Sequence, residues 1–225
     1  MDPKIILLVR NFNRPEYLEN TLKSLLLSDI DKCHQRYIYD DGSNDPMVNE
    51  ILNNDSYINH ENKQFVVIRN EQNVGCRKSF TDALNYIKQN NNDFDFILTL
   101  DNDVVVKPDL VSVMLSEYMK ASDKFNTNNI LFTGFNCKNA HLTMIENNDT
   151  YYTKSTCGAV NWFFHKTLFD FIIENWNINL DWGVNHAMNS QNWPMCCVTK
   201  SVVNHVGYFG LNSNGNCDID TDFDK

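Results

Sequence analysis

Three short clusters of polar residues in this 225-residue chain each follow an apolar run, and each has side chains that bind charged or hydroxyl-rich ligands. Residues 40–43 read Asp-Asp-Gly-Ser, residues 101–103 read Asp-Asn-Asp, and residues 204–207 read Asn-His-Val-Gly. Asp101 and Asp103 directly follow an apolar run, and two carboxylates so placed repel each other unless a cation or a hydroxyl-rich ligand occupies the site. The alternative for this segment is a capped turn with no ligand.

The apolar runs that precede the first two clusters, together with the segments of helical spacing between them, predict a parallel sheet. Strands are expected at residues 5–9, 36–39, 65–68 and 96–100, and helical spacing begins near Pro15, with Asn13 as the N-cap, and again at Arg77. Strands that alternate with helices in this way form right-handed βαβ units. Ligands of such sheets gather at the carboxyl ends of the strands, where the first two clusters lie.

The pattern changes after Asp101. The sequence predicts helices that begin at Pro108, span residues 168–176 and follow Asp181, and strands at residues 130–133, 156–164 and 198–205. We expect one α/β domain over residues 1–225. It should contain a doubly wound, mostly parallel sheet with helices on both faces, a mixed C-terminal part and a mobile acidic tail at residues 218–225.

Composition restricts the kind of partner. A formal charge of −10 argues against non-specific binding to nucleic acid or anionic lipid. No stretch of about 18 apolar residues and no signal-peptide core is present, and the seven cysteines are scattered without a CxxC pair, as is typical of reduced thiols. We therefore expect a cytoplasmic protein without a membrane span. So acidic a chain needs a metal ion, an Arg or backbone amides to hold a phosphate group.

Four motifs, taken in order, resemble those of a family 2-type glycosyltransferase with the GT-A fold, and the resemblance extends over residues 4 to about 212. Residues 6–18 resemble its first strand, Asn-Arg turn and helix, and residues 39–45 (Tyr-Asp-Asp-Gly-Ser-Asn-Asp) resemble its nucleotide loop. Residues 70–75 with Asn85 resemble its Asn-x-Gly helix start, and residues 100–103 (Leu-Asp-Asn-Asp) resemble its DxD metal motif. The resemblance implies a metal-dependent, inverting, hexosyltransferase-like enzyme. Such an enzyme moves a sugar from a nucleoside-diphosphate sugar, with a UDP-sugar favoured, to a hydroxyl of a glycan or protein acceptor.

The same resemblance implies roles for residues in the first half. Asn11 would frame the base, and Asp41 would accept a hydrogen bond from a pyrimidine N–H. Asp101 would bind the ribose hydroxyls. Asp103 would ligate Mg²⁺ or Mn²⁺ between the two donor phosphates, where the cation neutralises the leaving diphosphate.

Three basic or titratable residues would act on the diphosphate by the same resemblance. Arg69 and Arg77 would lie near it and compensate its charge. His205 resembles the late His that contacts the metal or the β-phosphate in relatives. The alternatives are a position at the surface edge for either Arg and a packed, hydrogen-bonded ring for His205.

The donor sugar and the base fall in the second half. Residues 157–161 resemble the small-residue segment that lines the donor sugar, where Gly158 and Ala159 permit close approach, although a simple strand is the alternative. Asp181 resembles the family's catalytic carboxylate, with Leu before it where many members have Glu. It would take the acceptor's proton, and its alternative is an N-cap of the next helix.

Two other classes of protein remain as alternatives. A nucleotidyltransferase would show a Gly-rich basic phosphate loop after the first strand, and residues 10–14 contain no Gly. A non-catalytic sugar-nucleotide or glycan-binding module on the same fold would have no need of Asp101, Asp103 and a candidate base.

Overall fold

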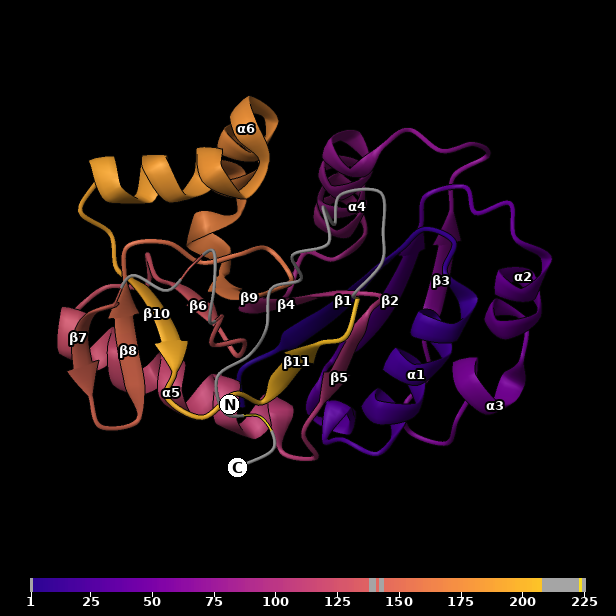
Figure 1. Ribbon diagram of the computed structural model, residues 1–225, viewed down its shortest axis with the longest axis horizontal. Helices are drawn as coiled ribbons and strands as arrows, with labels where there is room; N and C mark the ends of the chain where they lie inside the picture. The colour runs from indigo at the N-terminus through magenta and orange to yellow at the C-terminus, as the bar shows by residue number, and fades with distance from the viewer. Residues whose placement is uncertain (1, 138–140, 142–143, 208–222, 224–225) are drawn as a thin grey trace.

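One nine-stranded sheet crosses the whole protein in the computed structural model (Figure 1). The structure describes residues 2–137, 141, 144–207 and 223, so the expected acidic tail lies outside the described residues apart from Phe223. The strands in spatial order are β3 (Val66–Arg69), β2 (Gln35–Asp40), β1 (Ile5–Asn11), β4 (Phe96–Asp101), β9 (Asn161–His165), β6 (Leu131–Thr133), β10 (Met195–Val198), β8 (Tyr151–Lys154) and β7 (Met144–Asn148).

The direction of the strands divides this sheet. β3, β2, β1 and β4 are parallel, as the alternating pattern predicts. β9 is antiparallel to both of its neighbours, β10 runs parallel to β6, and the β8 and β7 edge is antiparallel. The expected α/β domain with a mostly parallel sheet and a mixed C-terminal part is therefore confirmed.

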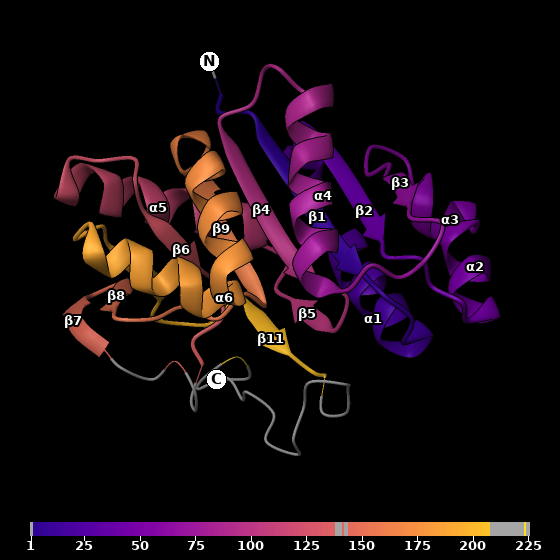
Figure 2. The ribbon, with the colours of Figure 1, turned by 90° about the horizontal axis from the view of Figure 1, so that it is seen from above.

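Helices cover both faces of the sheet because side chains alternate along the buried strands. In β1, Ile5, Leu7 and Val9 pack toward one face, while Ile6 and Leu8 pack toward the other. The first face is covered by α1 (Pro15–Leu26), α2 (Pro46–Leu52), α3 (Asp55–Ile58) and α5 (Leu110–Phe125), and the second by α4 (Cys76–Asn90) and α6 (Phe169–Ser190). Figure 2 shows α4 and α6 side by side on their face. Burial of each large apolar side chain contributes about 1.5–3 kcal/mol to this packing.

A second, two-stranded sheet differs from the sequence-based expectation. β5 (Val104–Val106) pairs with β11 (Val203–His205), with His205 opposite Val104. The expected strand 198–205 is thus wrong as one element, because the chain leaves β10 at Val198 and enters a different sheet at Val203. The expected strand 156–164 is also wrong in its first half. Residues 157–159 form the loop that precedes β9.

The helix α6 contains a break where two separate helices were expected. Asn179 (φ −155°, ψ 48°) and Leu180 (φ 51°, ψ −137°) leave the helical region, and Asp181 begins the second half. A branched residue at positive φ is strained, and such strain is held only by surrounding contacts. Arg77 provides two of them, because its Nη1 donates to the carbonyls of Asn177 (2.8 Å) and Ile178 (3.3 Å).

The start of α1 also differs from the expectation. Arg14, not Asn13, occupies the N-cap position, at φ 60° and without a side-chain cap bond. The Asn13 side chain instead accepts hydrogen bonds from the backbone N–H groups of Asn44 (3.0 Å) and Asp45 (3.2 Å). Asn13 therefore joins the end of β1 to the loop after β2. Within the described part of the chain, none of the helices is long and apolar enough to cross a bilayer.

Candidate active site

The loop after β2 is organised by two buried carboxylates. Asp41 accepts four hydrogen bonds, from the side chains of Asn70 (2.9 Å) and Asn73 (3.0 Å) and from the backbone N–H groups of Val74 and Gly75 (both 3.0 Å). A carboxylate has about four acceptor positions, so Asp41 fixes the loop that leads into α4. Its contact with a pyrimidine N–H stays a prediction.

Asp40 fixes the other side of the same loop. It is fully buried, and it accepts from Asn11 Nδ2 (2.6 Å), from the Ser43 backbone and from Arg69 Nε (2.9 Å). Arg69 Nη2 also donates to the Ser43 carbonyl at 3.2 Å. The structure therefore places Arg69, at the end of β3, on the carboxylate that shapes this loop.

Asn11 joins the first two polar clusters. Its Nδ2 donates to Asp40, and its Oδ1 accepts from Asn102 Nδ2 at 2.7 Å. Asn102 also donates to the Asn13 carbonyl at 3.1 Å. The turn that carries Asp101 and Asp103 is thereby held against the end of β1.

Asp101 ends β4 and forms an ion pair with Arg10, whose Nη2 lies 2.5 Å from Asp101 Oδ1. Burial raises the pKa of Asp101 to about 6, and the charge of Asp103 adds to the rise while Arg10 opposes it. The same Arg10 nitrogen donates to the Ala159 carbonyl at 2.5 Å. Arg10 therefore connects Asp101 to the loop in which Gly158 and Ala159 were expected to line the donor sugar.

Asp103 lies between two cationic or titratable side chains. Its Oδ2 is 2.6 Å from Arg14 Nη1 and 3.1 Å from His205 Nε2. Burial acts to raise the pKa of Asp103, but the hydrogen bond with His205 and the charge of Arg14 outweigh it and hold that pKa below its usual value. Gly207 approaches so closely that a Cβ there would lie 2.0 Å from Asp103 Oδ2. The pairing of β11 with β5 thus brings His205 and Gly207 to Asp103.

A divalent cation fits beside Asp103 only with help from a ligand. Within the described ranges, no group of three or more His, Cys, Asp or Glu side chains is placed to hold a metal ion. Asp103 Oδ1 is nevertheless buried and has no hydrogen-bond partner among the described residues. A carboxylate oxygen of this kind suits a hard cation that takes its other ligands from water and phosphate oxygens.

The candidate base belongs to α6 and is joined to these groups through the loop before β9. His141 Nε2 lies 3.6 Å from Asp181 Oδ2. The same ring packs against Gly158, next to the Ala159 whose carbonyl binds Arg10. Asp181 Oδ1 accepts from the backbone N–H of the next residue, Trp182, at 3.0 Å, whereas an N-cap side chain accepts from the N–H two or three residues further on.

Arg77 is placed differently from its expected position near a diphosphate. Its guanidinium is bound to the carbonyls at the end of the first half of α6, and its own carbonyl accepts from Trp176 Nε1 at 3.1 Å. These contacts favour the alternative, an edge position that holds the break in α6.

Several residues that contact the candidate site residues are absent from the sequence-based set, among them Arg10, Arg14, Asn73 and His141. Arg10, Arg14 and Asn73 lie inside the motifs that carry the family resemblance, so the sequence contains a signal for them. His141 lies in a segment without periodicity or motif, and nothing in the local sequence points to it.

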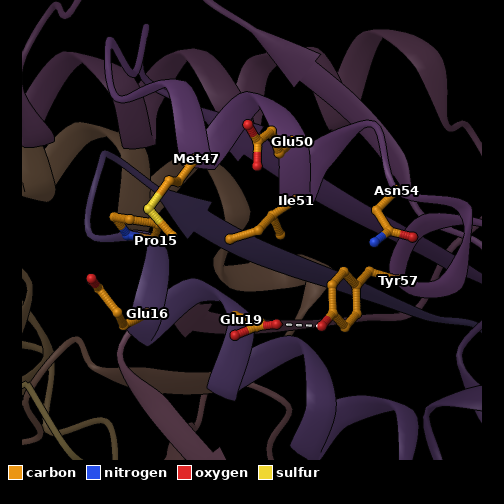
Figure 3. A pocket seen from close by; sticks show the side chains of 8 residues that line it. All are labelled: Pro15, Glu16, Glu19, Met47, Glu50, Ile51, Asn54 and Tyr57. Atoms are coloured by element: carbon orange, nitrogen blue, oxygen red, sulfur yellow. Dashed lines mark hydrogen bonds between the residues drawn. The ribbon is translucent and has the colours of Figure 1, made fainter.

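A pocket of about 210 Å³ opens between α1, α2 and α3, and none of these carboxylates lines it (Figure 3). Its walls carry Glu16, Glu19 and Glu50, and Tyr57 donates its hydroxyl to Glu19 at 2.5 Å. Three glutamates disfavour a diphosphate, and no expected site residue lines this pocket. We therefore place the candidate site at the carboxyl ends of β1, β2 and β4.

Comparisons with known proteins agree with the fold. The chain resembles the crystal structure of GalNAc-T7 with UDP, GalNAc and Mn²⁺, with a TM-score of 0.67 and 14% identity over 95% of this chain and 45% of that chain. It also resembles S. aureus TarS 1–349, with a TM-score of 0.61 and 16% identity over 91% of this chain and 61% of that one. The chain thus spans about half of the length of these solved chains, and the comparison with curated proteins gives no match. Residues 7–171 match the model of glycosyl transferase family 2, so the chain belongs to that family.

Proposed function

We propose that this protein transfers a sugar from a UDP-sugar to a hydroxyl group of a glycan or protein acceptor, with inversion at the anomeric carbon. The observation that carries the proposal is the placement of Asp41, Asp101 and Asp103 at the carboxyl ends of β2 and β4. Asp181 on α6 is joined to this edge through His141, Gly158 and the Ala159–Arg10 contact. Each of the four carboxylates has a different environment, so each suits a different part of a nucleotide-sugar reaction. The solved structure of GalNAc-T7 with UDP, GalNAc and Mn²⁺ supports the choice of donor and cation.

The reaction is a single displacement. The acceptor oxygen forms a bond to the anomeric carbon as the bond from that carbon to the diphosphate oxygen breaks, and the electron pair leaves with the diphosphate. Asp181 accepts the proton of the acceptor hydroxyl. Its side chain is 21% exposed, so an acceptor can reach it.

The remaining residues hold the donor. Asp41 and Asp40 order the loop that frames the base, and Asp101 offers a carboxylate to the ribose hydroxyls. Mn²⁺ or Mg²⁺, held by Asp103 and His205, would supply neutralisation of the leaving diphosphate. Arg10 and Arg14 pair with Asp101 and Asp103 on the same edge.

The test is a panel of UDP-, GDP- and dTDP-sugars, each with Mn²⁺, with Mg²⁺ and with EDTA. Calorimetry measures donor binding, and release of the nucleoside diphosphate measures turnover. We expect UDP-sugars to bind and react, and only with a divalent cation. Metal-dependent binding without turnover toward any acceptor would favour the binding module instead.

A further inference from the structure

His141 lies between the loop at residues 157–159 and the second half of α6. It is 4% exposed and therefore buried, although His is a residue type of only intermediate average burial. Its Nε2 is 3.6 Å from Asp181 Oδ2, and its ring stacks on Trp182 with 5.1 Å between centroids and 29° between planes. The imidazole is therefore held against the residue that we propose as the base.

The other side of the ring is closed by Gly158. A Cβ at this position would lie 2.9 Å from His141 Cδ2 and 3.1 Å from Nε2, so only glycine leaves room for the imidazole. The ring is thus fixed between a residue of the expected donor-sugar loop and an aromatic residue beside the base.

A buried amide fixes the distance between these two segments. Asn185 is fully buried in the second half of α6, its Oδ1 accepts from the Cys157 backbone N–H (2.9 Å), and its Nδ2 donates to the Cys157 carbonyl (3.1 Å). Asn185 and Asp181 are one helical turn apart, so this double contact also sets where Asp181 lies relative to Gly158.

His141 and Asp181 differ in burial, and so they differ in which of them a substrate can reach. The His141 side chain is 5% exposed and that of Asp181 is 21% exposed, so a substrate reaches the carboxylate and not the imidazole. Only an N–H at Nε2 can donate to the carboxylate, which leaves Nδ1 as the acceptor in the neutral ring. Nδ1 is buried and has no partner among the described residues.

We propose that His141 is the positioning residue of Asp181. Its Nε2–H faces Oδ2 and holds the carboxylate in the orientation that receives the acceptor's proton. The distance of 3.6 Å is longer than a hydrogen bond, and such contacts tighten when an active site is filled. The proton from the acceptor stays on Asp181, and His141 keeps its own proton throughout. This role rests on the proposed function.

Nuclear magnetic resonance tests the pairing without any turnover. In the full chain labelled with ¹⁵N-histidine, we expect the His141 ring to show protonated Nε2 and unprotonated Nδ1. Its Nε2 resonance should move in Asp181→Asn. Identical His141 ring signals in the parent and in Asp181→Asn would overturn the pairing.

Kinetics test the consequence for transfer. His141→Phe keeps a flat ring beside Trp182 but loses the N–H, so we expect kcat to fall by up to about 10² while UDP-sugar affinity stays unchanged, because a misplaced catalytic group costs that much. His141→Gln returns an N–H near the same place and should recover most of the loss. In the Asp181→Asn background, His141→Phe should cause no further loss, because the two residues act as a unit.

His186→Gln is the matched control, since His186 is exposed and meets only the edge of Trp182, at 6.4 Å between centroids. We expect parental kcat. An equal loss in His186→Gln, or a fall in donor affinity in His141→Phe with kcat unchanged, would overturn the proposal. If His141→Phe does not fold, Gly158→Ala, whose Cβ displaces the ring, should give the loss of kcat instead. A parent that binds no UDP-sugar and transfers nothing removes the proposed function and this role together, whereas the ring signals still report the pairing.

Discussion

At the scale of single residues, environment divides chemically identical carboxylates among different tasks. Asp41 has all its acceptor positions filled by protein donors, whereas Asp103 has one oxygen between Arg14 and His205 and the other without a partner among the described residues. The Asp181 side chain is more exposed than that of Asp103, at 21% against 7%. Under the proposed function, the same type of side chain serves as a loop anchor at Asp41, a cation ligand at Asp103 and a proton acceptor at Asp181.

Asp181→Asn should keep the fold and the binding of UDP with the cation while transfer is lost. An amide can still accept the Trp182 N–H, but it cannot take a proton, and general-base catalysis contributes about 10²–10⁴-fold. Transfer to an identified acceptor and donor binding by calorimetry measure the two effects separately. Transfer near the parental rate would show that Asp181 only begins the second half of α6.

Asp41→Ala should weaken UDP binding without removing the need for metal. Its loss leaves four donors of the loop before α4 without their acceptor, and a hydrogen bond to a charged group contributes about 1.5–3 kcal/mol. Calorimetry with UDP and chemical unfolding check both effects. Asp82→Ala, in the exposed Lys78–Asp82 pair on α4, is the control and should change little. Unchanged UDP affinity in Asp41→Ala would remove this loop from the donor site.

At the scale of secondary-structure elements, the parts predicted from sequence are those whose signal is local. The apolar runs of β1, β2 and β4 and the spacing of α1 and α4 depend only on neighbouring residues. β5 and β11 have three residues each, which is too short for an alternating apolar and polar pattern to be recognised. Their pairing also joins residues about a hundred positions apart, which no local pattern can indicate. The position of His205 beside Asp103 follows from the family motif and from that pairing, not from periodicity.

The break in α6 is a similar case. Leu180 has a positive φ that its residue type disfavours, and the contacts of Arg77 that hold it come from another helix. The sequence predicted helical segments before and after this point but gave no reason for their junction. His141 was missed for the same physical reason, because its contacts with Gly158 and Asp181 join distant segments.

Arg77→Met tests whether the break in α6 controls the base. The variant keeps an apolar stem but removes the donors to Asn177 and Ile178, so the strained segment should relax and Asp181 should shift. We expect slower transfer with nearly unchanged UDP affinity, measured by initial rates and calorimetry. Lys78→Met, one residue further along α4, is the matched control and should transfer like the parent. A large loss of UDP affinity in Arg77→Met would instead place Arg77 on the diphosphate.

At the scale of the whole molecule, a chain with a formal charge of −10 is proposed to hold an anion. The fold places positive charge at the candidate site, since β1 and the turn after it bring Arg10 and Arg14 to the edge where Asp101 and Asp103 lie. Both arginines are already paired with these carboxylates, so their charge is largely compensated within the protein. An added divalent cation is the remaining source of positive charge for a diphosphate.

UDP should therefore stabilise the protein only when a divalent cation is present. A ligand at about a hundred times its dissociation constant adds about 2.7 kcal/mol to the free energy of unfolding, and thermal unfolding with UDP in Mn²⁺ and in EDTA measures the difference. Asp103→Ala removes the oxygen that has no partner in the described residues, so this variant should lose the dependence on Mn²⁺. Asp123→Ala removes an exposed carboxylate from α5 and should respond like the parent. Equal stabilisation by UDP in EDTA and in Mn²⁺ would contradict a shared cation, and an Asp103→Ala variant that still responds to Mn²⁺ would place the metal elsewhere.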